Sequence, residues 1–293
     1  MRALVIGVSG QVGAALVKVL RARGHEAIGT YATQPVPDAI PLDVRDHAQS
    51  EHLVAYTKPD WILCAGGFTH VDRCEDEPEA AFGINRDGPV HLARMGQRVG
   101  ARFVYFSTDY VFDGTAGPYA EDAPVKPLSV YGRSKAEGER AVLEVPRSAV
   151  VRTSVVYGPE RQEKNFVYQL LRSARGDRKL RPASDQRTNP TYSPDLAEAT
   201  VELCANQLGG IWHLGGADVM DRLEFSRLVC AAWGIDAAWL QPVKTAELKQ
   251  KAARPLDGGL RIDKARASLR TALRGPREGL AAMRAALNPG AGR

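Results

Sequence analysis

The sequence predicts an α/β protein built on a doubly wound parallel sheet, with a smaller α/β lobe in its C-terminal part. Two observations carry this prediction. Short apolar runs alternate with longer amphipathic stretches through the first half of the 293 residues, which is the pattern of parallel βαβ units. Beyond Val155 the alternation becomes irregular and prolines interrupt the segments, as expected for a lobe of different architecture.

The elements of the first half follow from local periodicity and from residues that start or stop helices. Apolar residues recur at helical spacing over 11–22, and Gly24 follows as a common helix stop. Ser129 can cap a helix that must end by Pro146. The predicted strands cover residues 3–8, 26–31, 40–44, 61–65, 102–107 and 148–153. The predicted helices cover residues 11–22, 47–57, 76–99 and 130–144.

The second half contains fewer strand signals and no internal repeat. Its predicted elements are helices over 165–174, 194–206, 222–233 and 276–287, and a strand near 211–214. No flexible linker separates the two halves of the sequence. We therefore divide the chain into a sheet domain over residues 1–154 and a lobe over residues 155–293 that is partly interleaved with it.

Composition excludes several classes of protein. Apolar residues make up 44% and charged residues 25%, as in ordinary globular chains. No apolar run approaches the ~18 residues of a membrane-spanning helix, and the first run is too brief for a signal peptide. We therefore expect a cytoplasmic protein without a membrane partner, whose four cysteines stay reduced. The cysteines and histidines lack metal-ligand spacing, so no metal site is predicted.

Positive charge is concentrated near the C-terminal end. The net charge is +5, and the segment from Lys244 onward holds 12 basic and 4 acidic residues. Such a bias indicates a solvated helical surface more often than a site for nucleic acid. Because few aromatic residues interleave with these charges, we do not expect nucleic acid as a partner.

Three glycines, Gly7, Gly10 and Gly13, stand between the first predicted strand and the first predicted helix. Because they lack a Cβ atom, they permit a tight turn and let the backbone approach a pyrophosphate, while the helix N-terminus supplies free N–H groups. This placement predicts a Rossmann-type dinucleotide site. The alternative is that the glycines only pack the helix against the strand.

The residues that would distinguish between dinucleotides are less typical. The second strand ends in GTYA (29–32), with neither an acid for the adenosine ribose nor an arginine. Since no carboxylate would repel a 2′-phosphate there, NADPH is favoured over NADH. Asp43 ends the third strand and has two interpretations: it accepts a hydrogen bond from the adenine amine, or it is a turn or helix-capping carboxylate.

Tyr131 and Lys135 form the one YxxxK pair of the sequence and share a face of the helix predicted over 130–144. A tyrosine titrates near ~10, but an adjacent ammonium favours the phenolate and lowers that pKa toward the range of acid–base catalysis. The preceding strand ends near Thr108, whose hydroxyl can hold a substrate oxygen. The alternative is a surface helix with an ordinary tyrosine and lysine.

At this point the sequence resembles a known family. The strings FSTDYVFDG (106–114) and VYGRSKAEGE (130–139) look like the extended short-chain dehydrogenase/reductase superfamily, and more narrowly the dTDP-4-dehydrorhamnose reductase family. Further matches in chain order are the glycine motif (7–13), FTHVD (68–72), DQRTNPTYSPDLA (185–197) and ARPLDGGL (253–260). The resemblance implies an NAD(P)H-dependent oxidoreductase that reduces the carbon-4 ketone of a nucleotide-linked, in this family dTDP-linked, 4-keto-6-deoxysugar.

The resemblance also implies roles for individual residues. Tyr131 would protonate the developing alkoxide, Lys135 would hold the nicotinamide ribose, and Thr108 completes the catalytic set. The residues implied in cofactor binding are Gly7, Gly10, Gln11, Val12, Asp43, Ala65, Gly66, Thr69, Tyr131 and Lys135. The residues implied in substrate binding are Thr108, Asp109, Tyr110, Val155, Arg187 and Arg254. The two arginines would meet the diphosphate or, alternatively, form surface or intramolecular ion pairs.

Two departures from the family pattern keep a second hypothesis open. Val155 stands where the family has a tryptophan that packs on the sugar. After the fourth strand, Cys64 replaces the usual asparagine and Gly66-Gly67 replace two alanines. The alternative to a reductase is a non-catalytic nucleotide-binding subunit resembling the regulatory beta subunit of methionine adenosyltransferase. A homodimer is a further expectation from the superfamily, although no residue demonstrates it.

Overall fold

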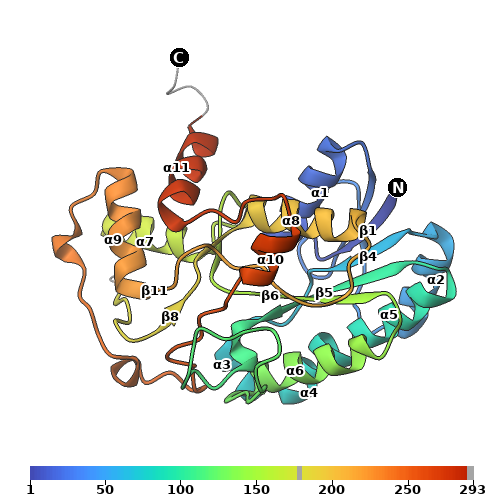
Figure 1. Cartoon of the computed structure of the whole chain (residues 1–293), viewed down its shortest axis with the longest axis horizontal. Helices are drawn as coiled ribbons and strands as arrows, with labels where there is room; N and C mark the ends of the chain where they lie inside the picture. The colour runs from blue at the N-terminus through green and yellow to red at the C-terminus, as the bar shows by residue number, and fades with distance from the viewer. Residues whose placement is uncertain (177–179, 289–293) are drawn as a thin grey trace.

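A computed structural model describes residues 1–176 and 180–288, and it contains a sheet of seven parallel strands (Figure 1). The strands are, in chain order, β1 (Arg2–Ile6), β2 (Glu26–Tyr31), β3 (Ala39–Pro41), β4 (Trp61–Cys64), β5 (Arg102–Thr108), β6 (Ser148–Thr153) and β10 (Gly210–His213). Their order across the sheet is β10-β6-β5-β4-β1-β2-β3. Apart from β10 at the edge, this is the strand order of a doubly wound dinucleotide-binding sheet, which confirms the predicted fold class.

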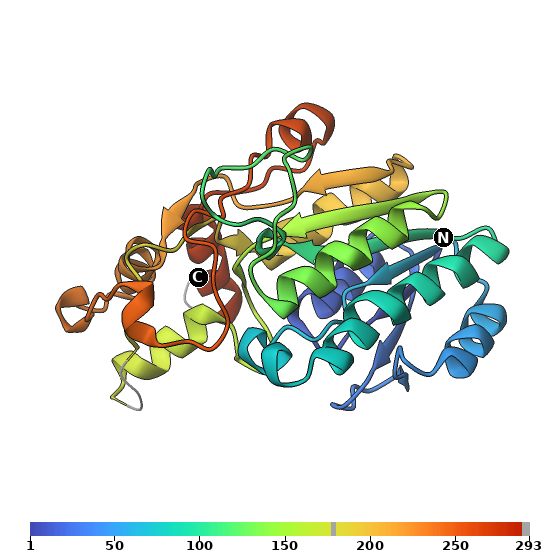
Figure 2. The same ribbon diagram turned by 90° about the horizontal axis from the view of Figure 1, so that it is seen from below.

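Helices cover both faces of the sheet (Figures 1 and 2). One face carries α1 (Gln11–Ala22), α8 (Ser193–Ala205) and α10 (Asp263–Ser268), and the other carries α2 (His47–Thr57), α5 (Gly88–Arg98) and α6 (Val130–Leu143). Because side chains alternate along a strand, Val104 and Phe106 of β5 enter the first core, whereas Phe103 and Tyr105 enter the second. The sheet is therefore buried on both sides, as its apolar strands require.

The segment between β4 and β5 differs from the single helix predicted over 76–99. It is divided into α3 (Val71–Asp76), α4 (Pro78–Phe82), a π-helical turn η1 (Gly83–Asp87) and α5. Pro78 begins α4 because the first turn of a helix needs no N–H from that residue. Such π-turns often occur at functional sites, and this one holds the fully buried Asn85 beneath the loop that follows β4.

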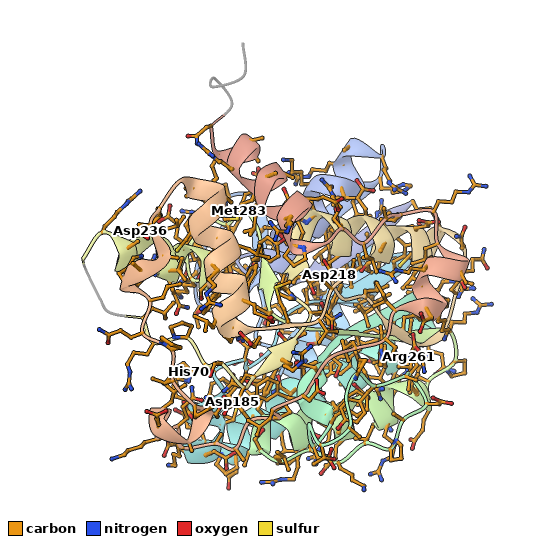
Figure 3. All side chains as sticks on the ribbon, turned by 60° about the vertical axis from the view of Figure 1, so that its left-hand side comes forward. His70, Asp185, Asp218, Asp236, Arg261 and Met283 are labelled. Carbon is orange, nitrogen blue, oxygen red and sulfur yellow. The ribbon has the colours of Figure 1, made fainter. Side chains whose placement is uncertain are left out.

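A smaller lobe lies beyond the ends of the strands. Its helices are α7 (Phe166–Ala174), α9 (Arg222–Trp233) and α11 (Pro276–Leu287), and its strands pair as β7 (Val156–Tyr157) with β9 (Thr191–Tyr192) and β8 (Arg187–Thr188) with β11 (Met220–Asp221). The three helices share one core, in which Phe225 of α9 and Met283 of α11 (labelled in Figure 3) are fully buried.

The second half of the chain contributes to both parts of the molecule, since α8, β10 and α10 pack on or join the large sheet. The division at residue 154 stays a prediction about folding units. Short 3-10 turns complete the described structure at η2 (Asp109–Val111), η3 (Ala237–Trp239) and η4 (Thr245–Leu248). Across residues 1–176 and 180–288, no helix has both the length and the apolar character needed to cross a membrane.

The parallel strands end at one edge of the sheet, next to the lobe (Figure 2). The register pairs Ile6 with Cys64 and Thr108 with Thr153, so the loops that follow β1, β4, β5 and β6 emerge side by side. In open α/β sheets, ligands bind at this carboxyl edge where the strand order reverses. The fold therefore places the sequence motifs of these loops around one site.

Candidate active site

A cleft of about 640 Å³ lies at the carboxyl edge of the sheet. The predicted site residues that line it are Gly7, Gly10, Gln11, Val12, Ala65, Gly66, Thr69, Thr108, Asp109, Tyr110, Tyr131, Lys135 and Val155. These residues come from five separate segments of the chain. The structure thus brings together the predicted glycine turn and the predicted catalytic set, whereas Asp43, Arg187 and Arg254 are not among the residues that line the cleft.

The glycine turn fits the pyrophosphate of a dinucleotide. Gly7 adopts φ +86°, a left-handed conformation that favours glycine, and a Cβ there would stand 2.7 Å from the Cα of Gly66. A Cβ on Gly13 would collide with the carbonyl oxygen of Gly7. Gly10 caps α1 without a side-chain hydrogen bond, so the first N–H groups of the helix are available to an anion.

Lys135 is buried and held in place by the end of β5. Its Nζ donates a hydrogen bond to the carbonyl oxygen of Phe106 at 2.7 Å and lies 4.3 Å from the centroid of the Tyr105 ring. Burial lowers the pKa of Lys135 to about 8. The lysine sits one turn after Tyr131 in α6, a helix whose N-terminus is capped by the Ser129 hydroxyl.

The protonation of Tyr131 differs from the sequence-based expectation. Burial raises the pKa of its phenol well above the ordinary value, and the contact with Thr108 opposes that rise only in part. The expected lowering by Lys135 does not appear, because the ammonium of Lys135 points to the Phe106 carbonyl and desolvation of the phenolate dominates. A phenol that stays protonated at neutral pH is the form that a proton donor requires.

A buried carboxyl group accepts hydrogen bonds from two hydroxyls that line the cleft. Asp109 accepts hydrogen bonds from the Thr108 hydroxyl at 3.0 Å and from the Ser154 hydroxyl at 2.8 Å. Burial raises the pKa of Asp109 to about 6, and the two hydroxyls and Arg222 oppose the rise. Asp109 therefore fixes the orientation of Thr108, at the cost of keeping a carboxylate away from water.

This cost predicts a pH-dependent gain in stability for Asp109→Asn. A folded-state pKa above the unfolded value means that the folded wild-type protein loses stability as the pH rises from about 4 through about 6. The asparagine of the variant does not titrate. The free energy of unfolding of the variant relative to wild type should therefore increase across this pH window, and above pH ~6 the total increase should be about 2–3 kcal/mol. Urea midpoints measured from pH 4 to pH 7 test this, and a difference that is constant with pH contradicts it.

Asn85 is a site residue that the sequence reasoning missed. Its side-chain oxygen accepts from the Phe68 N–H at 2.9 Å, and its amide nitrogen donates to the Phe68 carbonyl at 3.1 Å and the Ser134 hydroxyl at 3.0 Å. It thus ties the loop after β4 to the helix that carries Tyr131 and Lys135. In the sequence Asn85 is followed directly by Arg86 and Asp87, so nothing distinguishes it from the other polar residues of the predicted helix.

Val155 lines the cleft in a strained conformation. It adopts φ +44°, which is a genuine outlier for a β-branched residue, and its carbonyl accepts a hydrogen bond from Thr191 N at 3.2 Å. Strain of this kind is concentrated at functional sites and is maintained by the surrounding structure. The position is therefore well placed to shape the substrate space, although its side chain is smaller than the tryptophan of the family pattern.

The three remaining predicted residues form ion pairs outside the cleft. Asp43 accepts hydrogen bonds from the Arg45 guanidinium at 2.6 Å and from the Arg45 backbone N–H at 3.0 Å, and its contact with adenine stays a prediction. Arg187 is half exposed and lies 4.0 Å from Asp257. Arg254 forms two hydrogen bonds with Asp72, at 2.6 and 2.9 Å, and lowers the pKa of that carboxyl to about 2.

Arg222, at the start of α9, is a second residue that the sequence reasoning missed. Its side chain lines the cleft, and its guanidinium lies 5.1 Å from the centroid of the Phe166 ring. Among residues 1–176 and 180–288, Arg222 forms no ion pair within 4.0 Å. Nothing in the sequence around it marks a site, because α9 lies far along the chain from the sheet motifs.

The parallel sheet, the glycine turn and the Tyr–Lys pair beside it define a protein of the extended short-chain dehydrogenase/reductase type. The chain belongs to the RmlD substrate binding domain family, whose profile matches residues 1–288. The resemblance read from the sequence motifs is thereby confirmed. A nicotinamide cofactor fits both the family and the geometry of the cleft.

Two curated proteins illustrate the relationship. The spore coat polysaccharide biosynthesis protein SpsK of Bacillus subtilis is 36% identical over 87% of this chain and 87% of its own length. The dTDP-4-dehydrorhamnose reductase of Mycobacterium tuberculosis is 35% identical over 86% of this chain and 82% of its own length.

Solved structures agree with the sequence relatives. The dTDP-4-dehydrorhamnose reductase of Clostridium acetobutylicum superimposes with a TM-score of 0.90 at 31% identity, covering 98% of this chain and 100% of that one. The enzyme of the same name from Bacillus anthracis, in complex with NADP, gives a TM-score of 0.88 at 29% identity, covering 96% and 98%.

Proposed function

We propose that this chain reduces the carbon-4 ketone of a nucleotide-linked 4-keto-6-deoxysugar, as a dTDP-4-dehydrorhamnose reductase in dTDP-rhamnose biosynthesis. The observation that carries the proposal is the convergence of Thr108, Tyr131 and Lys135 on the cleft that begins at the glycine turn. The family makes the chain an NAD(P)-dependent oxidoreductase. The names of its relatives favour this activity over the non-catalytic regulatory subunit.

The side chains of the cleft supply what a ketone reduction needs apart from the hydride. A reduced nicotinamide, when bound, delivers the hydride to carbon 4. The Thr108 hydroxyl would turn its one proton from Asp109 to the ketone oxygen, and Tyr131 would give that oxygen its proton as the C=O bond becomes an alcohol. The phenolate that remains takes a proton from solvent, and Lys135 has the role that the resemblance implies, which is to hold the nicotinamide ribose.

The residues around the glycine turn support NADPH as the cofactor. Gly7, Gly10, Gln11 and Val12 would face the pyrophosphate, and Ala65, Gly66 and Thr69 follow β4 on the other side of the cleft. No acidic residue occurs in the segment from Ala32 to Val36 after β2, so a 2′-phosphate meets no carboxylate there. A homodimer and a cytoplasmic location stay predictions from the sequence.

Arg222 is the residue that best fits the anionic part of the substrate. It faces the cleft near Tyr110 and Asp109, whereas Arg254 is already paired with Asp72 and Arg187 lies outside the cleft. A guanidinium can form bidentate hydrogen bonds with a diphosphate. We therefore assign the diphosphate contact to Arg222 rather than to Arg187, whereas the part of Arg254 in binding stays a prediction from the sequence motifs.

Arg222→Gln is expected to raise the KM for the keto-sugar by about ten- to a hundredfold, because one charge-assisted interaction is lost. The Kd for NADPH should stay within about twofold of wild type, since the residues proposed to hold the cofactor come from other segments of the cleft. Arg187→Gln serves as the comparison and should change KM by less than about threefold. Steady-state kinetics with both variants decide between the two arginines, and an unchanged KM in Arg222→Gln excludes its role.

The activity itself is tested with purified protein, NADPH or NADH, and a dTDP-4-keto-6-deoxyhexose. Oxidation of the reduced cofactor that depends on the ketone, together with an alcohol at carbon 4 in the product NMR spectrum, supports the proposal. The corresponding UDP-linked ketone tests the choice of nucleotide. If neither cofactor is oxidised, and the chain instead forms a stable complex with a methionine adenosyltransferase, the regulatory alternative replaces the reductase.

A further inference from the structure

A second cavity adjoins the cleft on the far side of the glycine turn. It has a volume of about 550 Å³ and is lined by Val8, Ser9, Gly10, Ala14, Thr33, Gln34, Pro35, Val36, Glu160, Arg161, Gln162 and Lys164. We call it the side cavity. Several of its residues, including Ser9, Gly10 and Thr33, also line the cleft, so the two spaces are continuous around the start of α1.

The walls of the side cavity come from two distant parts of the chain. One wall is the loop that directly follows β2, the position where the adenosine ribose of a dinucleotide lies. The other wall is residues 158–165, here called the covering segment, which runs between β7 and α7. The ribose end of a bound dinucleotide would therefore lie between these two walls.

Hydrogen bonds hold the covering segment against the glycine turn. The Gln162 side chain donates to the carbonyl of Ser9 at 2.6 Å, and the Gln11 side chain donates to the carbonyl of Gly158 at 3.3 Å. The Arg161 guanidinium donates to the carbonyl of Pro35 at 3.4 Å, which places the cation over the loop after β2. The segment is thus fixed in register with the cofactor site.

The charges of the side cavity favour an anion. Arg161 and Lys164 are exposed, and within the described part of the chain neither forms an ion pair. The one carboxylate in the lining, Glu160, accepts a hydrogen bond from the backbone N–H of Asn165 at the start of α7. Two cations that form no ion pair in the described structure thus line the side cavity beside the loop that follows β2.

We propose that Arg161 and Lys164 form the binding site for the 2′-phosphate of NADPH, so that the covering segment, and not the end of β2, selects the cofactor. The proposal rests on the proposed function in that it assumes a nicotinamide dinucleotide in the cleft. It accounts for how a 2′-phosphate could be bound although residues 32–36, which follow β2, contain neither an acidic nor a basic side chain. Arg161 supplies a planar fork for the phosphate oxygens, and Lys164 adds a second positive charge.

The test measures nucleotide binding without any sugar substrate. Isothermal titration of the full chain gives Kd values for NADPH, NADH, 2′,5′-ADP and 5′-AMP. Wild type should bind NADPH about ten- to a hundredfold more tightly than NADH, and 2′,5′-ADP correspondingly more tightly than 5′-AMP. Arg161→Gln/Lys164→Gln should remove this preference and leave the Kd for NADH within about twofold.

The matched control is Lys18→Gln/Arg21→Gln, which removes two exposed cations of α1 that do not line the side cavity. It should retain the preference, which separates a local contact from the overall field of the protein. In wild type the preference should also weaken in high salt and below pH ~6, where the phosphate monoester gains a proton.

The outcomes distinguish failure of the 2′-phosphate site from failure of the proposed substrate. Equal binding of NADPH and NADH by wild type, or an undiminished preference in Arg161→Gln/Lys164→Gln, overturns the 2′-phosphate site. A preference that disappears in this variant supports the site even if no keto-sugar is reduced, and in that case only the proposed substrate fails. If none of the four nucleotides binds, the site and the proposed function fail together.

Discussion

Replacing Tyr131 with phenylalanine is expected to lower kcat for ketone reduction by about a thousandfold or more, within the range that a positioned general acid contributes. The substitution removes one hydroxyl and keeps the ring, so the T-shaped contact with Tyr110, with centroids 5.5 Å apart, remains. The Kd for NADPH should stay within about twofold. Steady-state kinetics and cofactor titration on the same preparation provide both numbers.

The control for Tyr131→Phe is Tyr56→Phe, because Tyr56 is 78% exposed on α2 and far from the cleft in the chain. Its kinetics should equal those of wild type. Wild-type activity in Tyr131→Phe would remove the phenol from the mechanism and leave Thr108 or water as the proton source. A parallel loss of cofactor binding would indicate that the phenol has a positioning role instead.

The second large effect is expected at the buried ion pair between Arg152 of β6 and Glu139 of α6. Both side chains are almost completely buried, and three hydrogen bonds of 2.7 to 3.1 Å join the guanidinium to the carboxylate. The guanidinium also donates to the Glu121 carbonyl at 3.1 Å and lies 3.3 Å from the His213 ring nitrogen. Burial and this cation lower the pKa of His213 to about 3, so the ring stays neutral.

Arg152→Met is expected to reduce the free energy of unfolding by about 3–5 kcal/mol, because Glu139 then remains buried without a counter-charge. For a chain of this size the melting temperature should fall by roughly 10 °C. Calorimetry or urea titration measures the change.

The double variant Arg152→Met/Glu139→Leu tests the cause. It should recover much of the lost stability, since no uncompensated charge remains in the core. Arg98→Met, which breaks a pair with Glu51 that is more than half exposed on both sides, should change stability by less than about 1 kcal/mol. If Arg152→Met costs no more than this surface variant, the buried pair does not anchor α6.

The local parts of this molecule could be predicted from the sequence. Central parallel strands are buried on both faces and therefore appear as uninterrupted apolar runs, as WILC of β4 does. The glycine turn and the Tyr131–Lys135 spacing are also local, because each lies within one turn or one helix. Most of the residues predicted from these features line the cleft.

Two kinds of feature could not be predicted from the sequence: contacts between segments that are far apart in the chain, and the pKa values of buried groups. Arg161 and Arg222 reach the site from segments that follow the sheet motifs by many residues, and no spacing rule connects them to β2 or α6. The helix predicted over 76–99 is divided, and its π-turn holds Asn85 in hydrogen bonds with Phe68 and Ser134, contacts that no local spacing predicts. The pKa of Tyr131 went in the opposite direction because desolvation outweighed the neighbouring charge.

Helices from the C-terminal half of the chain pack on the large sheet, and this affects how the protein folds during synthesis. Val104 and Phe106 of β5 and Val151 of β6 lie in a core that also contains residues of α8 and α10. These two helices begin only at Ser193 and Asp263, late in the chain. A ribosome must therefore release most of the polypeptide before this apolar surface is shielded from water. A nascent or truncated chain ending at residue 154 would expose it and aggregate, so the nucleotide-binding half depends on the sequence that follows it for solubility during synthesis.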